Sequence, residues 1–224
     1  AIAPLLPGVQ EPARYTGGEV NMVKKNPEAV RVRFAFCFPD TYEVGMSHLG
    51  MKILYHILNK REEFYCERVF APWMDMERAM RENQIPLYSL ETFTPVRDFD
   101  LVGFTLQYEM SYTNVLNMLD LAGIPMTWKE RDAVDAPFVV CGGPCAFNPE
   151  PLADFVDLFM VGDGEEQILE LCEHYDAWKA RGGTREEFLL EMANIEGNYV
   201  PFFYEAQYVG ADEFAGLEST RGVV

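Results

Sequence analysis

A polar and aromatic stretch, PDTYEVGMSHLG at residues 39–50, separates an apolar run from a helix-like pattern. Its carboxyl, hydroxyl, phenol and imidazole groups could hold a ligand, and its glycine at position 45 would let a cofactor approach the backbone closely. Because connections of this kind usually have ~2–6 residues, a stretch of twelve favours a binding loop. The alternative is a long strand-to-helix loop that Ser47 caps. The candidate residues are Asp40, Thr41, Tyr42, Glu43, Gly45, Ser47 and His48.

A second candidate is the diglycine turn in CGGPC, which two cysteines flank. A zinc or iron–sulfur site needs further ligands, and no third cysteine follows closely, so we expect Cys141 to be a buried strand residue. The missing side chains of Gly142 and Gly143, just before Pro144, would let a flat group lie against the edge of a sheet. A tight turn without a ligand is the alternative.

The stretch VGDGEEQ resembles the start of a dinucleotide-binding fingerprint. Gly162 and Gly164 occupy the first two glycine positions, but Gln167 stands at the third. Glu165 and Glu166 suit the start of a helix and would repel a pyrophosphate. The sequence therefore disfavours nicotinamide and flavin dinucleotides. It also contains neither a P-loop nor a nucleophile elbow.

The composition limits the classes of partner. The 224 residues are 49% hydrophobic, which suits one domain with extensions, and the net charge of −18 repels phosphate backbones and anionic lipids. We therefore expect neither nucleic acid nor a membrane as a partner. The five cysteines form no secretory pattern, which predicts reduced thiols in the cytoplasm. The first residue, Ala1, and the connector-like LESTRGVV ending suggest a piece of a longer protein.

Apolar strand patterns alternate with amphipathic helix patterns along the chain, which predicts an α/β fold with an open, doubly wound parallel sheet. The unusual segments at 39–50, 105–114, 142–151 and 162–167 each follow a strand, so we expect them at one edge. Predicted strands lie at 30–38, 66–72, 85–91, 100–107, 138–143, 157–163 and 198–208, and predicted helices at 49–58, 74–83, 111–123, 151–156, 165–183 and 184–195.

The expected domain limits are an extended arm at 1–29, rich in proline and glycine, a domain at 30–195, and a terminal strand and linker at 196–224. The first helix, with Ser47 as its N-cap, is expected to bury one stripe of apolar residues. That stripe consists of Leu49, Ile53, Leu54, Ile57 and Leu58.

The ordered segments FCFPDTYEVGMSHLGMKILYHILN, CERVFAPWMDME, FDLVGFTLQYEMSYTNVLNML, GGPCAFNPEPLADFVDLFMVGDGEEQ and EGNYVPFFYE together resemble one family. The chain is similar, from about Arg14 to Tyr204, to the N-terminal, cobalamin-binding-type domain of an uncharacterised family of radical S-adenosylmethionine (radical SAM) proteins. The resemblance implies a Rossmann-like, flavodoxin-type cobalamin-binding architecture.

The resemblance also implies roles for the candidate residues. The corrin and its nucleotide tail would be enclosed by residues Asp40 to His48, by Thr105 and Gln107, and by Gly142 and Gly143. Pro144, Gly162 and Gly164 are further candidate cofactor-binding residues. The family pattern D-x-H-x-x-G has Tyr42 in place of histidine, so no histidine ligand to cobalt is expected. Only two cysteines of a CxxxCxxC motif are present, so the 4Fe–4S cluster and S-adenosylmethionine are expected in a missing downstream barrel.

By this interpretation the chain is a cofactor-binding domain that is inactive alone and whose partner is its own barrel, acting on an unknown substrate. The alternative is a vestigial domain that binds no cofactor and serves as a docking or homodimerisation module. In that case Phe104, Tyr108 and Phe147 would fill the corrin space. A flavodoxin-like mononucleotide binder is a third, less favoured interpretation because the edge is acidic.

Overall fold

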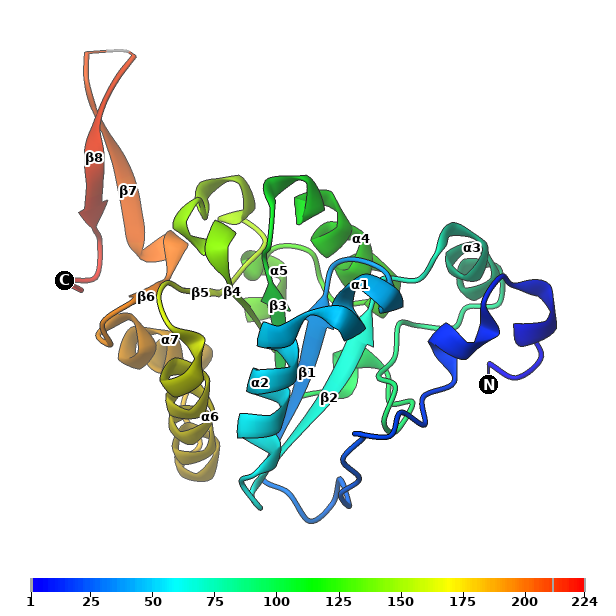
Figure 1. Ribbon diagram of the computed structural model, residues 1–224. Coiled ribbons are helices and arrows are strands. Elements are labelled where there is room, and N and C mark those ends of the chain that lie inside the picture. The colour runs from blue at the N-terminus through cyan, green and yellow to red at the C-terminus, as the bar shows by residue number, and fades with distance from the viewer. Residues whose placement is uncertain (1, 211, 224) are drawn as a thin grey trace.

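A computed structural model describes residues 2–210 and 212–223. Its centre is a six-stranded sheet in the order β2-β1-β3-β4-β5-β6, in which only β6 is antiparallel (Figure 1). The order 2-1-3-4-5 of the parallel strands is that of flavodoxin-like folds. The predicted doubly wound α/β class is therefore confirmed. The strands are β1 Val32–Phe38, β2 Phe64–Phe70, β3 Leu101–Thr105, β4 Phe138–Gly142, β5 Leu158–Met160 and β6 Asn198–Tyr199.

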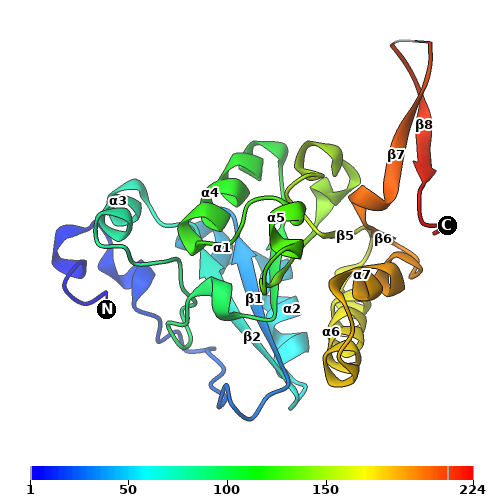
Figure 2. The ribbon, with the colours of Figure 1, turned by 180° about the vertical axis from the view of Figure 1, so that it is seen from behind.

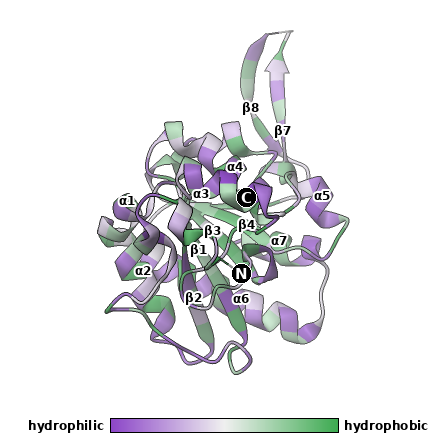
Figure 3. Ribbon diagram, turned by 90° about the vertical axis from the view of Figure 1, so that its right-hand side faces the viewer, coloured by the Kyte–Doolittle hydropathy of each residue, from purple (hydrophilic) through white to green (hydrophobic). Residues whose placement is uncertain are grey.

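Helices cover both faces of the sheet, which explains why the strands are hydrophobic along most of their length (Figure 3). On β1, Phe34 and Phe36 pack into one core cluster, whereas Ala35 and Cys37 pack into the other. One face carries α1 Tyr42–Ser47, α2 Leu49–Asn59, α6 Gly164–Arg181 and α7 Arg185–Ala193. The other carries α3 Met74–Glu82, α4 Tyr112–Ala122 and α5 Trp128–Asp132 (Figure 2).

The N-terminal arm covers the edge strand β2, which would otherwise offer unpaired backbone groups to other chains. The backbone N–H of Val23 donates to the Tyr55 hydroxyl at 2.8 Å, and the Tyr65 hydroxyl donates to the Val23 carbonyl at 3.1 Å. The Lys25 ammonium donates to the carbonyls of Arg61 and Phe64, both at 2.6 Å. The arm also contains two short 3-10 turns, at Leu6–Gly8 and Pro12–Tyr15.

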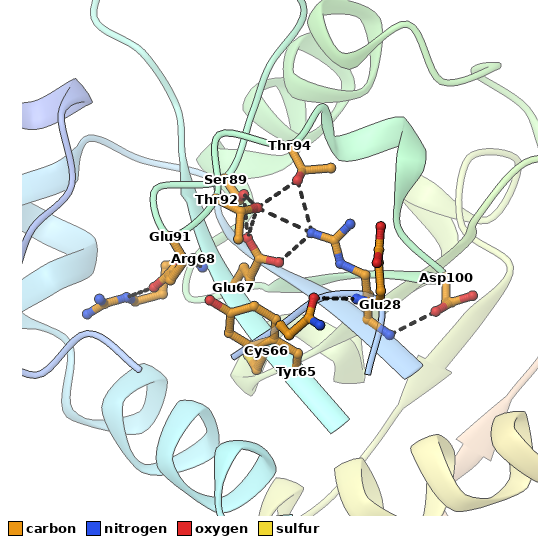
Figure 4. Close-up of polar contacts among 12 residues, drawn as sticks. Glu28, Tyr65, Cys66, Glu67, Arg68, Ser89, Glu91, Thr92, Thr94 and Asp100 are labelled. Carbon is orange, nitrogen blue, oxygen red and sulfur yellow. Dashed lines mark hydrogen bonds and ion pairs between the residues drawn. The ribbon is translucent and has the colours of Figure 1, made fainter. Parts of the chain in front are cut away.

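A buried polar network lies beside β2 (Figure 4). Glu67 accepts from Arg33 at 2.5 Å and from the hydroxyls of Ser89 and Thr92. Arg68 donates from Nε to Glu91 at 2.7 Å and is 2% exposed. The prediction of a strand at 85–91 is wrong, because this segment contacts β2 through side chains and one backbone hydrogen bond, from the Leu90 N–H to the Arg68 carbonyl at 2.9 Å, without forming a ladder. Only the isolated bridge between Tyr88 and Pro95 forms there.

Three other local predictions also require correction. The segment 151–156 contains a 3-10 turn at Glu150–Leu152 instead of a helix. The predicted strand at 198–208 divides into β6 and β7 Tyr204–Val209, and β7 pairs with β8 Glu213–Ser219 as a separate hairpin (Figure 1). Helix α2 buries Met51, Tyr55 and Leu58, at spacings of four and three residues, whereas Leu49 is 69% exposed. Of the predicted stripe, Leu58 is buried and Leu54 packs against the core, so the buried face overlaps the predicted stripe but is rotated away from Leu49 and Ile53.

Candidate functional site

A cavity of about 290 Å³ lies at the carboxyl end of the sheet, on the face that α2 and α6 cover. Its floor is built from alternate residues of four neighbouring strands, because side chains that are two positions apart share a face. Its walls are the N-terminal halves of α2 and α6, which include Gly50, Leu54 and Ile168. The floor residues are Phe34 and Phe36 of β1, Gly103 and Thr105 of β3, Val140 and Gly142 of β4, and Met160 of β5.

Three glycines shape this part of the site, each in a different way. A Cβ atom on Gly103 would lie 2.3 Å from the ring of Phe34, so the ring occupies the space of the missing side chain. A Cβ on Gly142 would meet only Met160, at 3.7 and 4.0 Å, so this position borders free space. Gly143 has φ +97° and would clash with the Leu106 carbonyl oxygen at 2.8 Å. The diglycine therefore shapes one cavity wall and makes the tight turn behind it.

Three polar side chains form a chain of hydrogen bonds on the cavity wall. The His48 Nδ1 atom accepts from the backbone N–H of Met51 at 3.2 Å, which makes His48, and not the predicted Ser47, the N-cap of α2. Since Nδ1 accepts, the ring proton lies on Nε2, which donates to Gln107 Oε1 at 3.0 Å. Gln107 Nε2 then donates to the Thr105 hydroxyl oxygen at 2.6 Å. These contacts fix the orientation of each group.

Gln167, near the start of α6, provides an unpaired polar atom beside the cavity. Its Nε2 donates to the Val161 carbonyl at 3.3 Å, whereas its buried Oε1 has no partner among the described residues. A buried acceptor without a donor costs free energy. Gly162, with φ +129°, and Gly164 form the turn that leads into α6 and also line the cavity.

Of the predicted site residues, the structure brings His48, Thr105, Gln107, Gly142, Gly143, Pro144, Gly162 and Gly164 together around the cavity. The other six, Asp40 to Glu43, Gly45 and Ser47, do not line it. They belong to α1 and its N-terminal flank, because residues 42–47 form a helix where we expected a continuous loop. Sequence reasoning missed the lining residues Gln167 and Gly103, although Gln167 holds the third fingerprint position and Gly103 lies two residues before Thr105.

The residues outside the cavity have structural contacts instead. Asp40 accepts from the Tyr108 hydroxyl at 2.7 Å, and Thr41 is the N-cap residue of α1. The Tyr42 ring packs edge-on against Phe70, with 5.5 Å between the ring centroids. Glu43 pairs with Arg14 at 2.5 Å, and the Ser47 hydroxyl donates to the Val44 carbonyl at 2.8 Å. A Cβ on Gly45 would lie 2.3 Å from the Phe70 ring.

The family described as radical SAM proteins, N-terminal, matches residues 50–201, which is more than half of the chain. The chain belongs to this family. The match covers β2 to β6 and most of the cavity wall, and it confirms the predicted relationship to the N-terminal part of radical SAM proteins.

An uncharacterised protein of Methanocaldococcus jannaschii is 29% identical to this radical SAM N-terminal domain over 133 residues. The aligned part is 58% of this chain and 24% of that protein, so the chain spans about a quarter of that relative's length. No solved structure matches the chain.

The radical SAM N-terminal domain contains no group of three potential metal ligands within residues 2–210 and 212–223. All five cysteines are buried and unpaired, and burial raises the pKa of Cys141 above its usual value. Cys141 is therefore a packed strand residue, as predicted. In the same described ranges, no helix has the length and apolarity needed to cross a membrane.

Two bulky residues that could have filled a ligand space lie outside the cavity of this domain. Tyr108 is 41% exposed and Phe147 is 75% exposed, and neither lines the cavity. Phe104 is buried and contributes to the wall. The cavity therefore stays open between the helices.

Proposed function

We propose that this chain is the cofactor-binding domain of a radical SAM enzyme and that its cavity holds the nucleotide tail of cobalamin. The observation that carries the proposal is the glycine-edged cavity between α2 and α6, at the carboxyl end of β1, β3, β4 and β5. In open α/β sheets, ligands bind outside the carboxyl ends of the strands, next to the point where the strand order reverses. Here that point lies between β1 and β3.

The size of the cavity selects the part of the cofactor that fits. Pockets that bury drug-sized ligands have about 300–1,000 Å³, so a cavity of about 290 Å³ suits a single flat aromatic base and not a corrin ring. The phenylalanine and glycine floor suits the faces of such a base. The open side of Gly142 supports a group that approaches the sheet closely.

The macrocycle itself would lie outside the cavity, over the carboxyl edge. Leu49, Met110 and Phe147 follow the ends of β1, β3 and β4 and are 69%, 85% and 75% exposed, so they offer apolar surface to a large ring. Both ring nitrogens of His48 already have hydrogen-bond partners, which supports a cobalt without His48 as its ligand.

Cobalamin, when bound, supplies methyl-transfer or one-electron chemistry, and the protein supplies position and a dry environment. In this proposal the floor residues exclude water from the tail, and the chain from His48 through Gln107 to Thr105 holds the wall rigid. The 4Fe–4S cluster and S-adenosylmethionine belong to a downstream catalytic barrel, and this domain contributes no acid or base.

A comparison of two corrinoids tests this proposal. The purified chain is mixed with hydroxocobalamin or with cobinamide, which lacks the nucleotide tail, and the visible spectrum is recorded after gel filtration. We expect retention of hydroxocobalamin and much weaker retention of cobinamide. Equal retention of the two corrinoids would show that the nucleotide tail does not occupy the cavity. Loss of both corrinoids would reject cofactor binding and favour a docking domain.

A further inference from the structure

The β7–β8 hairpin extends away from the body of the domain (Figures 1 and 2). Its pairing register places Ala206 opposite Leu217 and Tyr208 opposite Phe214, and all four side chains point to the same side of the ribbon. We call these four residues the apolar ribbon face. Tyr208, Phe214 and Leu217 are 57%, 59% and 45% exposed.

The opposite side of the ribbon is acidic. There Glu205 lies opposite Glu218, and Val209 lies opposite Glu213. Like charges directly opposite each other destabilise a two-stranded pair, and a lone hairpin is marginally stable in water. The ribbon is thus an amphipathic surface that gains stability when its apolar side is covered and its acidic side meets positive charge.

The base of the ribbon is nevertheless fixed to the body. The backbone N–H of Thr220 donates to the Phe203 carbonyl at 2.7 Å, and Val223 is 6% exposed within the core. At the start of the ribbon, Phe202 stacks on Trp128 of α5 with 4.1 Å between the ring centroids. These contacts fix where the ribbon leaves the domain, so its apolar face is held in one direction.

We propose that the apolar ribbon face is the docking surface for the catalytic barrel of the same polypeptide, an inference that rests on the proposed function. The family match ends at residue 201, and the ribbon begins at Tyr204, immediately after it. In the Methanocaldococcus relative, the 133 aligned residues are only 24% of the protein. The ribbon therefore stands at the boundary between the N-terminal domain of this family and the downstream part of the polypeptide.

Charge decides between the barrel and a second copy of this domain as the occupant. Two copies each carry a net charge of −18, which opposes their association. The ribbon itself adds Glu205, Glu213 and Glu218 on the side opposite the apolar face. Its partner surface therefore has an apolar centre with lysine or arginine at the rim, a composition that this acidic domain does not offer to itself.

Hydrogen exchange of the peptide covering 204–219 tests the inference. It is measured in the 224-residue chain and in the longer polypeptide that includes the barrel, both without corrinoid. We expect at least tenfold slower exchange in the longer polypeptide. The double variant Tyr208→Ser, Phe214→Ser should remove that protection, whereas the matched control Gln207→Ser, Val209→Ser on the opposite face should keep it.

Equal exchange in the two polypeptides would overturn the inference. So would protection that is already present in the 224-residue chain and is accompanied by a dimer in light scattering, since a second copy would then cover the face. Hydroxocobalamin retention is measured separately on the same samples. Ribbon protection without retained corrin would reject the cofactor proposal and leave the docking surface intact.

Discussion

Gly142→Leu is the sharpest test of the cavity as a binding site. Gly142 lies on the cavity side of β4, and a Cβ there meets Met160 only at ordinary contact distances. The backbone φ of Gly142 is outside the left-handed region, so a leucine fits the strand without backbone strain. Each of its four side-chain carbons takes up about the space of a water molecule, ~30 Å³, which fills roughly 120 Å³ of the cavity.

The loss of affinity follows from the buried area. An aromatic group buries at least ~150 Å², which at about 25 cal/mol per Å² contributes about 4 kcal/mol to binding. Excluding the tail should therefore weaken hydroxocobalamin binding by roughly 500-fold, since each 1.4 kcal/mol corresponds to a factor of ten. Stability should change by less than ~1 kcal/mol, because leucine packs on a pleated strand at least as well as glycine does.

The assay is a visible-absorbance titration with hydroxocobalamin, accompanied by thermal unfolding of each variant. Gly142→Ala is the matched control, because one methyl group leaves most of the cavity free and should change affinity by less than tenfold. Cobinamide binding should be the same in both variants and in the unmodified chain. A folded Gly142→Leu protein that binds hydroxocobalamin with unchanged affinity would refute the argument that the tail occupies this cavity.

Other contacts give further predictions. Gly103→Ala should lower the unfolding free energy by about 1–3 kcal/mol, because the new Cβ would overlap the Phe34 ring. Urea titration measures this change, and an unchanged midpoint would mean that the ring moves without cost. His48→Ala should lower the unfolding free energy by about 1 kcal/mol, because α2 loses its N-cap. His48→Asn should keep the stability of the unmodified chain, since asparagine is a good N-cap, and a loss as large as that of His48→Ala would contradict the capping role. Burial raises the pKa of Glu91 from 4.5 to about 7, against the opposing effect of Arg68. Because the folded pKa is the higher one, the stability that Glu91 contributes is fully present below pH 4.5 and is lost as the pH rises through about 7. Relative to Glu91→Gln, the unmodified chain should therefore lose up to about 3 kcal/mol of unfolding free energy between these pH values. If chemical denaturation gives a difference in unfolding free energy that does not depend on pH, the raised pKa is disproved.

The sequence by itself determined the class of the fold. Apolar residues on both faces of 30–38, followed by amphipathic helices, require a covered parallel sheet, since only helices on both sides bury such strands. The same alternation placed the connections after β1, β3, β4 and β5 at one edge. These features depend on backbone sterics and on the short-range periodicity of apolar residues, and both follow from the local sequence.

The tertiary structure decided which side chains face the cavity. Residues 42–47 contain no sequence signal strong enough to reveal α1, whose residues pack against Phe70 and Arg14 instead of the cavity. The replacement of Ser47 by His48 as the cap depends on Gln107, fifty-nine positions away, which holds the imidazole in place. Likewise, residues 85–91 contact β2 through the side chains of Ser89 and Glu91 and one backbone hydrogen bond, because Glu67 and Arg68 are buried there and need polar partners. In each case the deciding contact joins residues distant in sequence, so no local pattern could predict it.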